Sequence, residues 1–347
     1  MSKRKVCLIS PGHIASNPRL VKEADALHEA GFQVRVIASD YMEVIRSQDE
    51  TIYSKATWAF KRVGLGSPLG YAGRTLRQRS ARLLAAAGYI PSLSAAAWAH
   101  SRMTGRLAAA AAAESADLYI AHYLAAFPAA AAAARRHGAR LGFDAEDFHV
   151  GEVPDVSENR AEIALRDCIE AALLPRCRHL TAASPGIAEA YADRYGVSME
   201  TVLNVFPLSD APASCERQDG DRVGAAPSLY WFSQTLGPGR GLEFVVRAMG
   251  RMRTTVSLHL RGLPAAGYVE TLNRLAGETG VAGRVHLLPI ATPSEMARLA
   301  ACHDVGLALE LDQPPHRAVC LTNKIFVYLL AGLPLLLSDT PAQREMV

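Results

Sequence analysis

Paired cysteines, strong net charge and long apolar runs are all missing from this sequence. Its six cysteines are scattered without a C-x-x-C pair, which argues against a disulfide scaffold or a zinc ribbon. Free thiols in a reducing compartment are expected instead, and with them a cytoplasmic location. The net charge is only +3, too small for a chain that binds nucleic acid through its overall charge. The 347 residues fit a globular protein of about two domains.

No apolar run has the character of a secretion signal or a membrane span. Near the N-terminus only Val6–Ile9 is continuously apolar, which is too short for the core of a secretion signal. The longest segment without Asp, Glu, Lys or Arg is Leu83–Ser101, but glycine, proline, serine and histidine interrupt it. Most of its other residues are alanine. We therefore expect an alanine-rich pair of helices there.

Acidic residues are absent from residues 51–113. The segment carries these cations: Lys55, Lys61, Arg62, Arg74, Arg77, Arg79, Arg82, Arg102 and Arg106. On a helix, three of the arginines (Arg74, Arg77 and Arg82) fall near one face, whereas Leu76, Leu83, Leu84 and Ala87 can fall on another. Such a surface attracts anionic lipids or phosphate-bearing substrates, and it predicts a peripheral position on the inner face of the plasma membrane. The alternative is a solvated basic face whose tryptophans, Trp58 and Trp98, lie in the core.

Short apolar segments alternate with helical patterns through the first half of the chain. Residues 5–10 predict a strand, and residues 18–30 predict a helix with Asn17 as its N-cap and Gly31 after its end. The pattern continues with strands at 34–39, 118–122, 140–143 and 179–183, and with helices at 128–137 and after Pro185. This alternation is typical of a parallel sheet covered on both faces.

Residues 206–227 contain turn formers and charge with little periodicity, and they predict a linker. Beyond it the alternation resumes, with strands at 229–233, 256–262, 284–287, 305–309 and 335–337 and helices at 242–253, 294–301 and 323–331. We predict an α/β protein of two doubly wound Rossmann-like domains, residues 1–207 and 208–347. Their facing edges would form a cleft at the carboxyl ends of the strands, the default ligand site of such sheets.

Two glycine-bearing loops follow the first predicted strands of the two halves. One contains Gly12, and the other contains Gly237, Gly239 and Arg240 before a helix that opens at Leu242. Glycine lets backbone amides approach an anion, and a helix N-terminus favours negative charge. Neither loop has the G-x-G-x-x-G or Walker pattern, so nicotinamide binding and ATP hydrolysis lack motif support. The alternative is a pair of tight turns without a ligand.

Polar residues follow other predicted strands. His122 ends one strand, and Asp144 and Glu146 follow the next, where they could bind sugar hydroxyls, act as a base or hold a divalent ion. Their spacing does not match a calcium or zinc loop, which makes metal the least favoured of these. A structural histidine and a solvated acidic loop are the alternatives. In the second half, Thr322 or Asn323 would cap a helix whose first turn contains Lys324, a position that suggests an anionic partner or else an exposed lysine.

Several segments together resemble the GT-B glycosyltransferases of group 1, which are mostly retaining. The segments are Asn17–Gly31, Phe143-Asp-Ala-Glu-Asp, Ala183-Ser-Pro-Gly-Ile, Val202-Leu-Asn-Val-Phe, Gly237-Pro-Gly-Arg-Gly-Leu-Glu and Thr322-Asn-Lys-Ile-Phe-Val-Tyr-Leu-Leu-Ala-Gly-Leu-Pro. The resemblance implies a nucleotide-sugar donor held mainly by the second domain. It also implies a glycan, lipid-linked or small-molecule acceptor held by the first domain, as in polysaccharide biosynthesis. No cofactor and no metal ion are implied.

The resemblance also assigns roles to particular residues. Arg240 would contact the diphosphate, Gly12 would lie beneath the phosphates, and His122 would lie near the transferred sugar. The residues expected at the donor are Gly12, Gly237, Gly239, Arg240, Glu310, Thr322, Asn323 and Lys324, and those expected in catalysis are His122, Asp144 and Glu146. Retaining members of the family are described without a protein nucleophile, so catalysis would stabilise the departing diphosphate and orient the substrates.

Three departures from the family pattern favour other interpretations. Val319 and Val327 stand where the family often has two glutamates, and Gln234 stands where an arginine is common. The sequence also stops at Val347, before a further sheet element and a helix that the family would lead us to expect, so the second domain is expected to be incomplete. A GT-B-like binding or scaffold protein without activity is the main alternative. A sugar-nucleotide epimerase is a third.

Overall fold

The computed structural model describes residues 3–212, 226–311 and 313–347, and it divides the chain into two compact units. Unit 1 comprises residues 1–202 with 314–316, and unit 2 comprises residues 203–313 with 317–347. The predicted linker at 206–227 lies partly outside the described residues. Residues 314–316, predicted in the second domain, group with unit 1. The acceptor and donor roles of the two halves stay predictions, as does the cleft between them.

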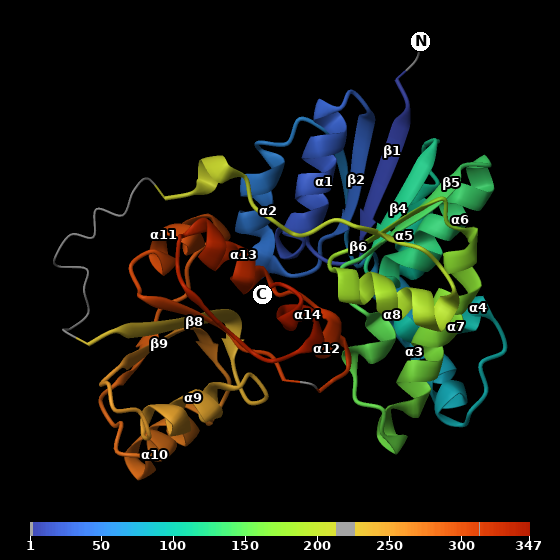
Figure 1. Ribbon diagram of the computed structural model, residues 1–347. Helices are drawn as coiled ribbons and strands as arrows, with labels where there is room; N and C mark the ends of the chain where they lie inside the picture. The colour runs from blue at the N-terminus through green and yellow to red at the C-terminus, as the bar shows by residue number, and fades with distance from the viewer. Residues whose placement is uncertain (1–2, 213–225, 312) are drawn as a thin grey trace. The chain divides into compact units, whose positions relative to one another are not determined.

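Unit 1 is built on a seven-stranded parallel sheet in the order β3-β2-β1-β4-β5-β6-β7 (Figure 1). Its strands are β1 (Lys5–Ser10), β2 (Gln33–Ser39), β3 (Ala59–Val63), β4 (Leu118–His122), β5 (Arg140–Ala145), β6 (His179–Ala182) and β7 (Glu200–Thr201). Strand order reverses between the neighbouring strands β1 and β4. The loops after these two strands therefore diverge at the carboxyl edge of the sheet, where ligands bind in folds of this kind.

Unit 1 also contains eight helices among its described residues. They are α1 (Pro18–Glu29), α2 (Arg46–Tyr53), α3 (Pro68–Ala86), α4 (Leu93–His100), α5 (Thr104–Ala111), α6 (Phe127–His137), α7 (Arg160–Leu173) and α8 (Pro185–Tyr195). The predicted start of α1 is confirmed, because the side chain of Asn17 accepts a hydrogen bond from the amide of Leu20, and Pro18 occupies the first turn. After α1, Gly31 has a φ of +87°, a left-handed conformation that glycine adopts without strain.

Unit 2 has a five-stranded parallel sheet in the order β10-β9-β8-β11-β12. Its strands are β8 (Ser228–Leu236), β9 (Ser257–Pro264), β10 (Val285–Leu288), β11 (Val305–Ala308) and β12 (Leu335–Leu337). Its helices are α9 (Leu242–Met249), α10 (Tyr268–Glu278), α11 (Met296–Ala300), α12 (His316–Val319, which begins in unit 1), α13 (Asn323–Leu330) and α14 (Pro341–Arg344). Here the strand order reverses between β8 and β11. The two doubly wound parallel sheets confirm the predicted fold class.

Some predicted elements have different bounds, and several elements, among them β3, α7 and α10, were not predicted. Strand β8 continues to Leu236, through an irregular register between Phe232 and Thr235, so the glycine loop begins later than predicted. Helix α9 ends at Met249 rather than at residue 253, and Gly250 follows, where a Cβ would lie 2.6 Å from the carbonyl oxygen of Thr279. Helix α10 was not predicted, although its buried side chains recur at helical spacing.

The alanine-rich segment forms a helical pair, as predicted: its first part ends α3 and its last part forms α4, with Gly88 and Pro91 between them. Among the described residues no helix has both the length and the apolar content needed to cross a bilayer. The two tryptophans differ, since Trp58 is buried in the core of unit 1 and Trp98 is 41% exposed.

Three histidines lie together inside unit 2. The ring of His259, which is fully buried in β9, stacks on His286 at 4.7 Å and lies 4.9 Å from the ring of His303. Burial lowers the pKa of His259 to about 4, and the positive charge that His286 can carry acts in the same direction. His259 is therefore neutral in the folded protein at neutral pH.

We predict that His259 makes the protein sensitive to mild acid. As pH falls from about 6.5 to about 4, the unfolded chain protonates this histidine and the folded chain does not, so stability falls with pH. Between pH 7 and pH 5 this effect should lower the free energy of unfolding by about 2 kcal/mol. Urea unfolding at the two pH values should show a clearly smaller loss for His259→Gln than for the parent protein. Equal losses would show that His259 is not responsible.

Candidate functional site

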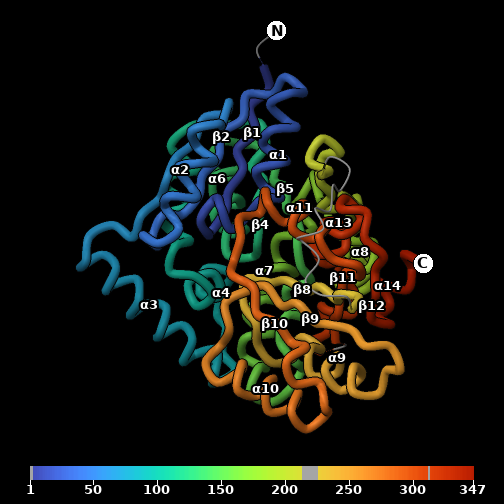
Figure 2. The backbone as a smooth tube through the Cα atoms, turned by 90° about the vertical axis from the view of Figure 1, so that its left-hand side faces the viewer, coloured from blue at the N-terminus to red at the C-terminus, as the bar shows by residue number. Residues whose placement is uncertain are grey.

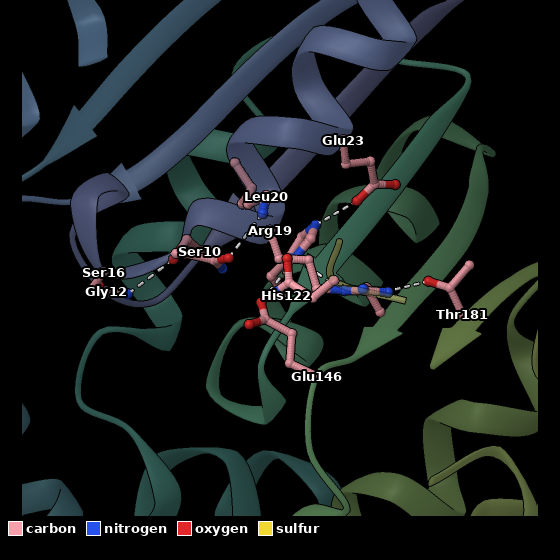
Figure 3. A network of polar contacts seen from close by, with 12 residues as sticks. Ser10, Gly12, Ser16, Arg19, Leu20, Glu23, His122, Glu146 and Thr181 are labelled. Atoms are coloured by element: carbon pink, nitrogen blue, oxygen red, sulfur yellow. Dashed lines mark hydrogen bonds and ion pairs between the residues drawn. The ribbon is translucent and has the colours of Figure 1, made fainter. Parts of the chain in front are cut away.

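The carboxyl edge of the unit 1 sheet gathers the three residues predicted for catalysis (Figure 3). His122 is the last residue of β4, and it pairs in register with Asp144 on β5. Nδ1 of His122 lies 3.3 Å from Asp144 Oδ2 and 3.2 Å from Glu146 Oε1. Neighbouring parallel strands end at the same edge, which brings the three side chains together although the sequence separates them.

Helix α1 contributes two further charges to this cluster. Arg19 Nε donates to Asp144 Oδ2 at 2.6 Å, and Arg19 Nη2 donates to Asp144 Oδ1 at 2.8 Å. Arg19 also donates to the carbonyl oxygen of Val202, and Glu23 lies 2.6 Å from Nε2 of His122. The sequence analysis assigned no role to Arg19 or Glu23. Their spacing of four residues on one helix, just after a predicted strand and its loop, was the available signal.

These contacts decide the charge states in the cluster. Burial of His122 opposes its charged form, but hydrogen bonds to Glu146 and Glu23 outweigh that effect and raise its pKa to about 10. Burial also opposes the charged form of Asp144, but Arg19 and His122 hold the pKa of Asp144 below its usual value. His122 is therefore an imidazolium at neutral pH. With both ring nitrogens engaged, it suits charge stabilisation better than the proton-handling role considered from the sequence.

The same cluster contains a possible set of metal ligands. One ligand atom each from His122, Asp144 and Glu146 lies within 4.8 Å of the others. Arg19 binds both carboxylate oxygens of Asp144, and the protonated ring of His122 has no lone pair for a cation. The chemistry of this set therefore fits ion pairing rather than metal binding. The expected metal independence stays a prediction.

A cavity of about 450 Å³ lies in unit 1 at the same edge of the sheet. It is lined in part by Gly12 after β1, Tyr41 after β2, Gln78 on α3, Arg102 after α4 and Tyr123 after β4. Among the described residues, Tyr123 is the only non-glycine residue with a positive φ, at +63°. Such strain persists where the surrounding structure imposes it and is frequent at ligand sites.

Buried contacts fix two parts of the cavity wall. His13 lies 2.6 Å from Asp49 through Nδ1, and its Nε2 accepts hydrogen bonds from the amides of Tyr41 and Met42 at 3.0 and 2.8 Å. This histidine therefore holds the loop after β2 in place beside the cavity. A Cβ on Gly12 would lie 3.0 Å from Ser16 Oγ, which explains a small residue there. The predicted place of Gly12 beneath donor phosphates stays a prediction.

Unit 2 contains the predicted donor residues other than Gly12, and its glycine loop and Glu310 follow β8 and β11 at the carboxyl edge of its sheet. The loop from Gly237 leads into α9, and Gly239 and Gly241 have φ values of +74° and +77°. A Cβ on Gly241 would lie 3.2 Å from Leu309, just after β11. Glycine is thus required here for both conformation and space.

Two cations lie close to the buried Glu310 beside this loop. Lys324 Nζ lies 3.5 Å from Glu310 Oε1, and Arg317 Nη1 lies 3.8 Å from Glu310 Oε2. Arg317 also donates to the carbonyl oxygen of Gly239 at 2.5 Å. Burial lowers the pKa of Lys324; the negative charge of Glu310 opposes this, and the positive charge of Arg240 adds to it. Arg317 is a residue that the sequence analysis missed, although it is a cation in the loop between Glu310 and Lys324.

The start of α13 differs from its predicted capping. Thr322 occupies the N-cap position without a side-chain capping bond, and its buried Oγ1 has no hydrogen-bond partner among the described residues. The predicted cap position is therefore confirmed for Thr322, but its side chain makes no capping bond. Asn323 Oδ1 accepts a hydrogen bond from Asn204 at 2.9 Å instead. Val327 packs in the buried apolar core of unit 2.

We predict that Arg19 is required for the stability of unit 1. Arg19→Met would remove both guanidinium hydrogen bonds to the buried carboxylate of Asp144, with His122 as the remaining neighbouring cation, and should lower the free energy of unfolding by about 3–5 kcal/mol. Urea unfolding measures this loss, with Arg46→Met as control, because Arg46 and Asp40 form an ion pair at the surface. If both variants lose the same stability, the buried pair has no special role. The double variant Arg19→Met with Asp144→Leu should recover part of the loss.

Known proteins resemble this chain in sequence profile and in fold. The sequence profile of the glycosyl transferase 4-like domain matches residues 16–207. No curated protein matches the chain. HepE from Anabaena, in complex with UDP-glucose, is a similar solved structure, with a TM-score of 0.68, 16% identity and coverage of 99% of this chain and 82% of that one.

Two further structures show the same fold at low identity. Sucrose-phosphate synthase from Thermosynechococcus elongatus has a TM-score of 0.70 and 15% identity, covering 99% of this chain and 84% of that one. The apo form of the lipopolysaccharide outer core galactosyltransferase WaaB has a TM-score of 0.61 and 13% identity, covering 99% and 83%. The matched domain spans more than half of the chain, and the fold agrees with it. The chain belongs to the glycosyl transferase 4-like family, and it is a glycosyltransferase of the GT-B fold.

Proposed function

We propose that this glycosyltransferase moves a sugar from a UDP-sugar to a glycan or lipid-linked acceptor in polysaccharide biosynthesis, with retention of configuration and without a metal ion. The cations around Glu310 are the observation that supports this most. Arg317 and Lys324 pair with one carboxylate, Glu310, and Arg240 lies close enough to Lys324 to act on it electrostatically, which leaves an excess of positive charge beside a glycine loop. An anion with more than one negative charge is the ligand that such a site fits.

The donor diphosphate accounts for the elements around this charge. Helix α9 begins at Leu242 without a side-chain capping bond, and the preceding glycines let an anion approach its N-terminus closely. The buried Oγ1 of Thr322, two residues before Lys324, offers one more hydrogen-bonding group. HepE, which shares the fold, was solved with UDP-glucose, and this supports UDP as the nucleotide.

The proposed reaction uses these cations to stabilise the leaving group. The bond between the anomeric carbon and the diphosphate oxygen breaks, the acceptor hydroxyl attacks from the same face, and its proton passes to the departing diphosphate. Charge on the diphosphate rises as the bond breaks, so fixed cations favour the transition state. Asp144 and Glu310 are both held in ion pairs, which favours a mechanism without a protein nucleophile.

The acceptor is proposed to bind in the cavity of unit 1. Tyr41 and Tyr123 offer rings for the apolar faces of a sugar, Arg102 offers hydrogen-bond donors, and the side-chain oxygen of Gln78 offers an acceptor. Glu146 of the neighbouring cluster is less buried than Asp144, and it is held by the imidazolium of His122. We propose that it orients an acceptor hydroxyl.

We also propose a cytoplasmic location with peripheral membrane contact. The described cysteines are all free thiols, and burial raises the pKa of Cys7 to about 11 and that of Cys177 to about 12. Such thiols remain protonated and unreactive at neutral pH, as suits structural residues of a reducing compartment.

Arg240→Ala is predicted to weaken UDP binding without unfolding the protein. Losing one charge-assisted contact to the diphosphate should raise the dissociation constant about 10-fold to 100-fold, measured by calorimetry. Arg247→Ala is the matched control, because Arg247 is an exposed arginine on α9 outside the loop. Unchanged affinity in Arg240→Ala would remove Arg240 from the donor site. UDP-glucose binding without transfer or hydrolysis would instead favour a binding protein.

Metal independence has its own test. If Arg240, Arg317 and Lys324 supply the charge that a divalent ion supplies elsewhere, EDTA should leave the rate of UDP-sugar turnover within about twofold of its value without chelator. The measurement is UDP release at saturating donor, with and without added Mg²⁺ or Mn²⁺. Loss of turnover in EDTA that is restored by a divalent ion would contradict the proposal.

A further inference from the structure

Helix α3 packs against α4 and α7 through small side chains. Ala81 and Ala85 are buried, and Gln78 Nε2 donates to the carbonyl oxygens of Ala99 and His100 at 3.3 and 3.4 Å. Arg74 also faces inward and donates to the carbonyl oxygen of Leu65, so it leaves the basic face on which the sequence analysis had placed it. This side of α3 therefore packs within unit 1.

The opposite side of α3 carries an exposed leucine stripe, which consists of Leu69, Leu76 and Leu83. These side chains are 88%, 68% and 73% exposed. At about 100° per residue, a spacing of seven residues returns to within about 20° of the same direction, whereas Ala85 lies about 180° from Leu76. Figure 2 shows α3 at the outer edge of unit 1, away from the sheet. A helix buried on one apolar face thus exposes a second one.

Positive charge and aromatic rings accompany the leucine stripe. Arg77 and Arg79 are exposed on either side of it, and the guanidinium of Arg77 lies 4.8 Å from the centre of the exposed ring of Trp98. Tyr89, just after the helix, is 60% exposed. No acidic residue occurs in residues 51–113, although Glu162 of α7 pairs with Arg82 at 2.8 Å and offsets part of the charge. Leucines between arginines, with aromatic residues nearby, match the interface of an anionic bilayer.

We propose that the leucine stripe of α3 inserts into the surface of an anionic lipid bilayer, with Arg77 and Arg79 at the headgroups. Charge complementarity selects this occupant over a second copy of the chain, which would bring the same cations face to face. The proposal specifies the element that makes the peripheral contact proposed above. It does not rest on the donor chemistry, so UDP binding and vesicle binding can fail separately.

The test is co-sedimentation of the full chain with vesicles of phosphatidylcholine alone or mixed with phosphatidylglycerol. We expect binding to the mixed vesicles that weakens at high salt, and much weaker binding to phosphatidylcholine alone. The triple variant Leu69→Ser, Leu76→Ser, Leu83→Ser should bind the mixed vesicles at least about tenfold more weakly. The matched control is Leu208→Ser, Leu263→Ser, Leu336→Ser, which removes three exposed leucines of unit 2 and should change binding less than about twofold.

The fluorescence of a tryptophan introduced on the leucine stripe reports whether the stripe inserts into the bilayer. In Leu76→Trp, lipids brominated on their acyl chains should quench the new fluorescence, whereas Leu208→Trp should be unaffected. Urea unfolding followed by far-ultraviolet circular dichroism reports that each variant is folded. The proposal is overturned if the parent protein does not bind anionic vesicles, if the stripe variant binds as the parent does, or if both triple variants lose binding equally. It is also overturned if the stripe variant only converts a dimer to a monomer in sedimentation.

Discussion

The ion pair between Arg19 and Asp144 holds the carboxyl edge of the first sheet together. It joins α1 to β5, and Thr181 of β6 and the carbonyl oxygen of Val202 share the same two side chains. A buried carboxylate is costly without a cation, so this pairing fixes the orientation of α1 above the sheet. His122 is a stable imidazolium because Glu146 and Glu23 bind its two ring nitrogens and the charge of Asp144 adds to their effect. The order of the site thus follows from one buried pair.

The two units use charge in opposite ways. In unit 1 the cations Arg19 and His122 are matched by carboxylates at hydrogen-bonding distance, which makes the cluster rigid and leaves little net charge. In unit 2 two cations, Arg317 and Lys324, share Glu310, and the excess positive charge remains beside a glycine loop and a helix N-terminus. A balanced cluster suits orientation of a neutral sugar, whereas an unbalanced one suits a diphosphate. This difference supports the proposed division between acceptor and donor.

Helix α3 connects the proposed acceptor cavity with the surface of the molecule. Its inner side contributes Gln78 to the cavity wall, and its outer side exposes the leucine stripe. The sequence predicts a basic amphipathic helix here, with Arg74 on its basic face. The structure turns Arg74 inward because Leu65 offers it a carbonyl oxygen, and this leaves leucines between Arg77 and Arg79 on the outer side.

Local sequence patterns predicted the fold class and many of the helices and strands. Asn17, Pro18 and Gly31 bound α1 because caps, proline and glycine act within a few residues of themselves. These patterns also placed His122 and Asp144 at strand ends, because short apolar runs and their limits are local signals. The ion pairs of Arg19 with Asp144 and of Arg317 with Glu310 could be seen only in the tertiary structure. The same is true of the full length of β8 and of the exposed leucine stripe on α3. These features depend on strand register and on contacts between distant segments, which local patterns do not specify.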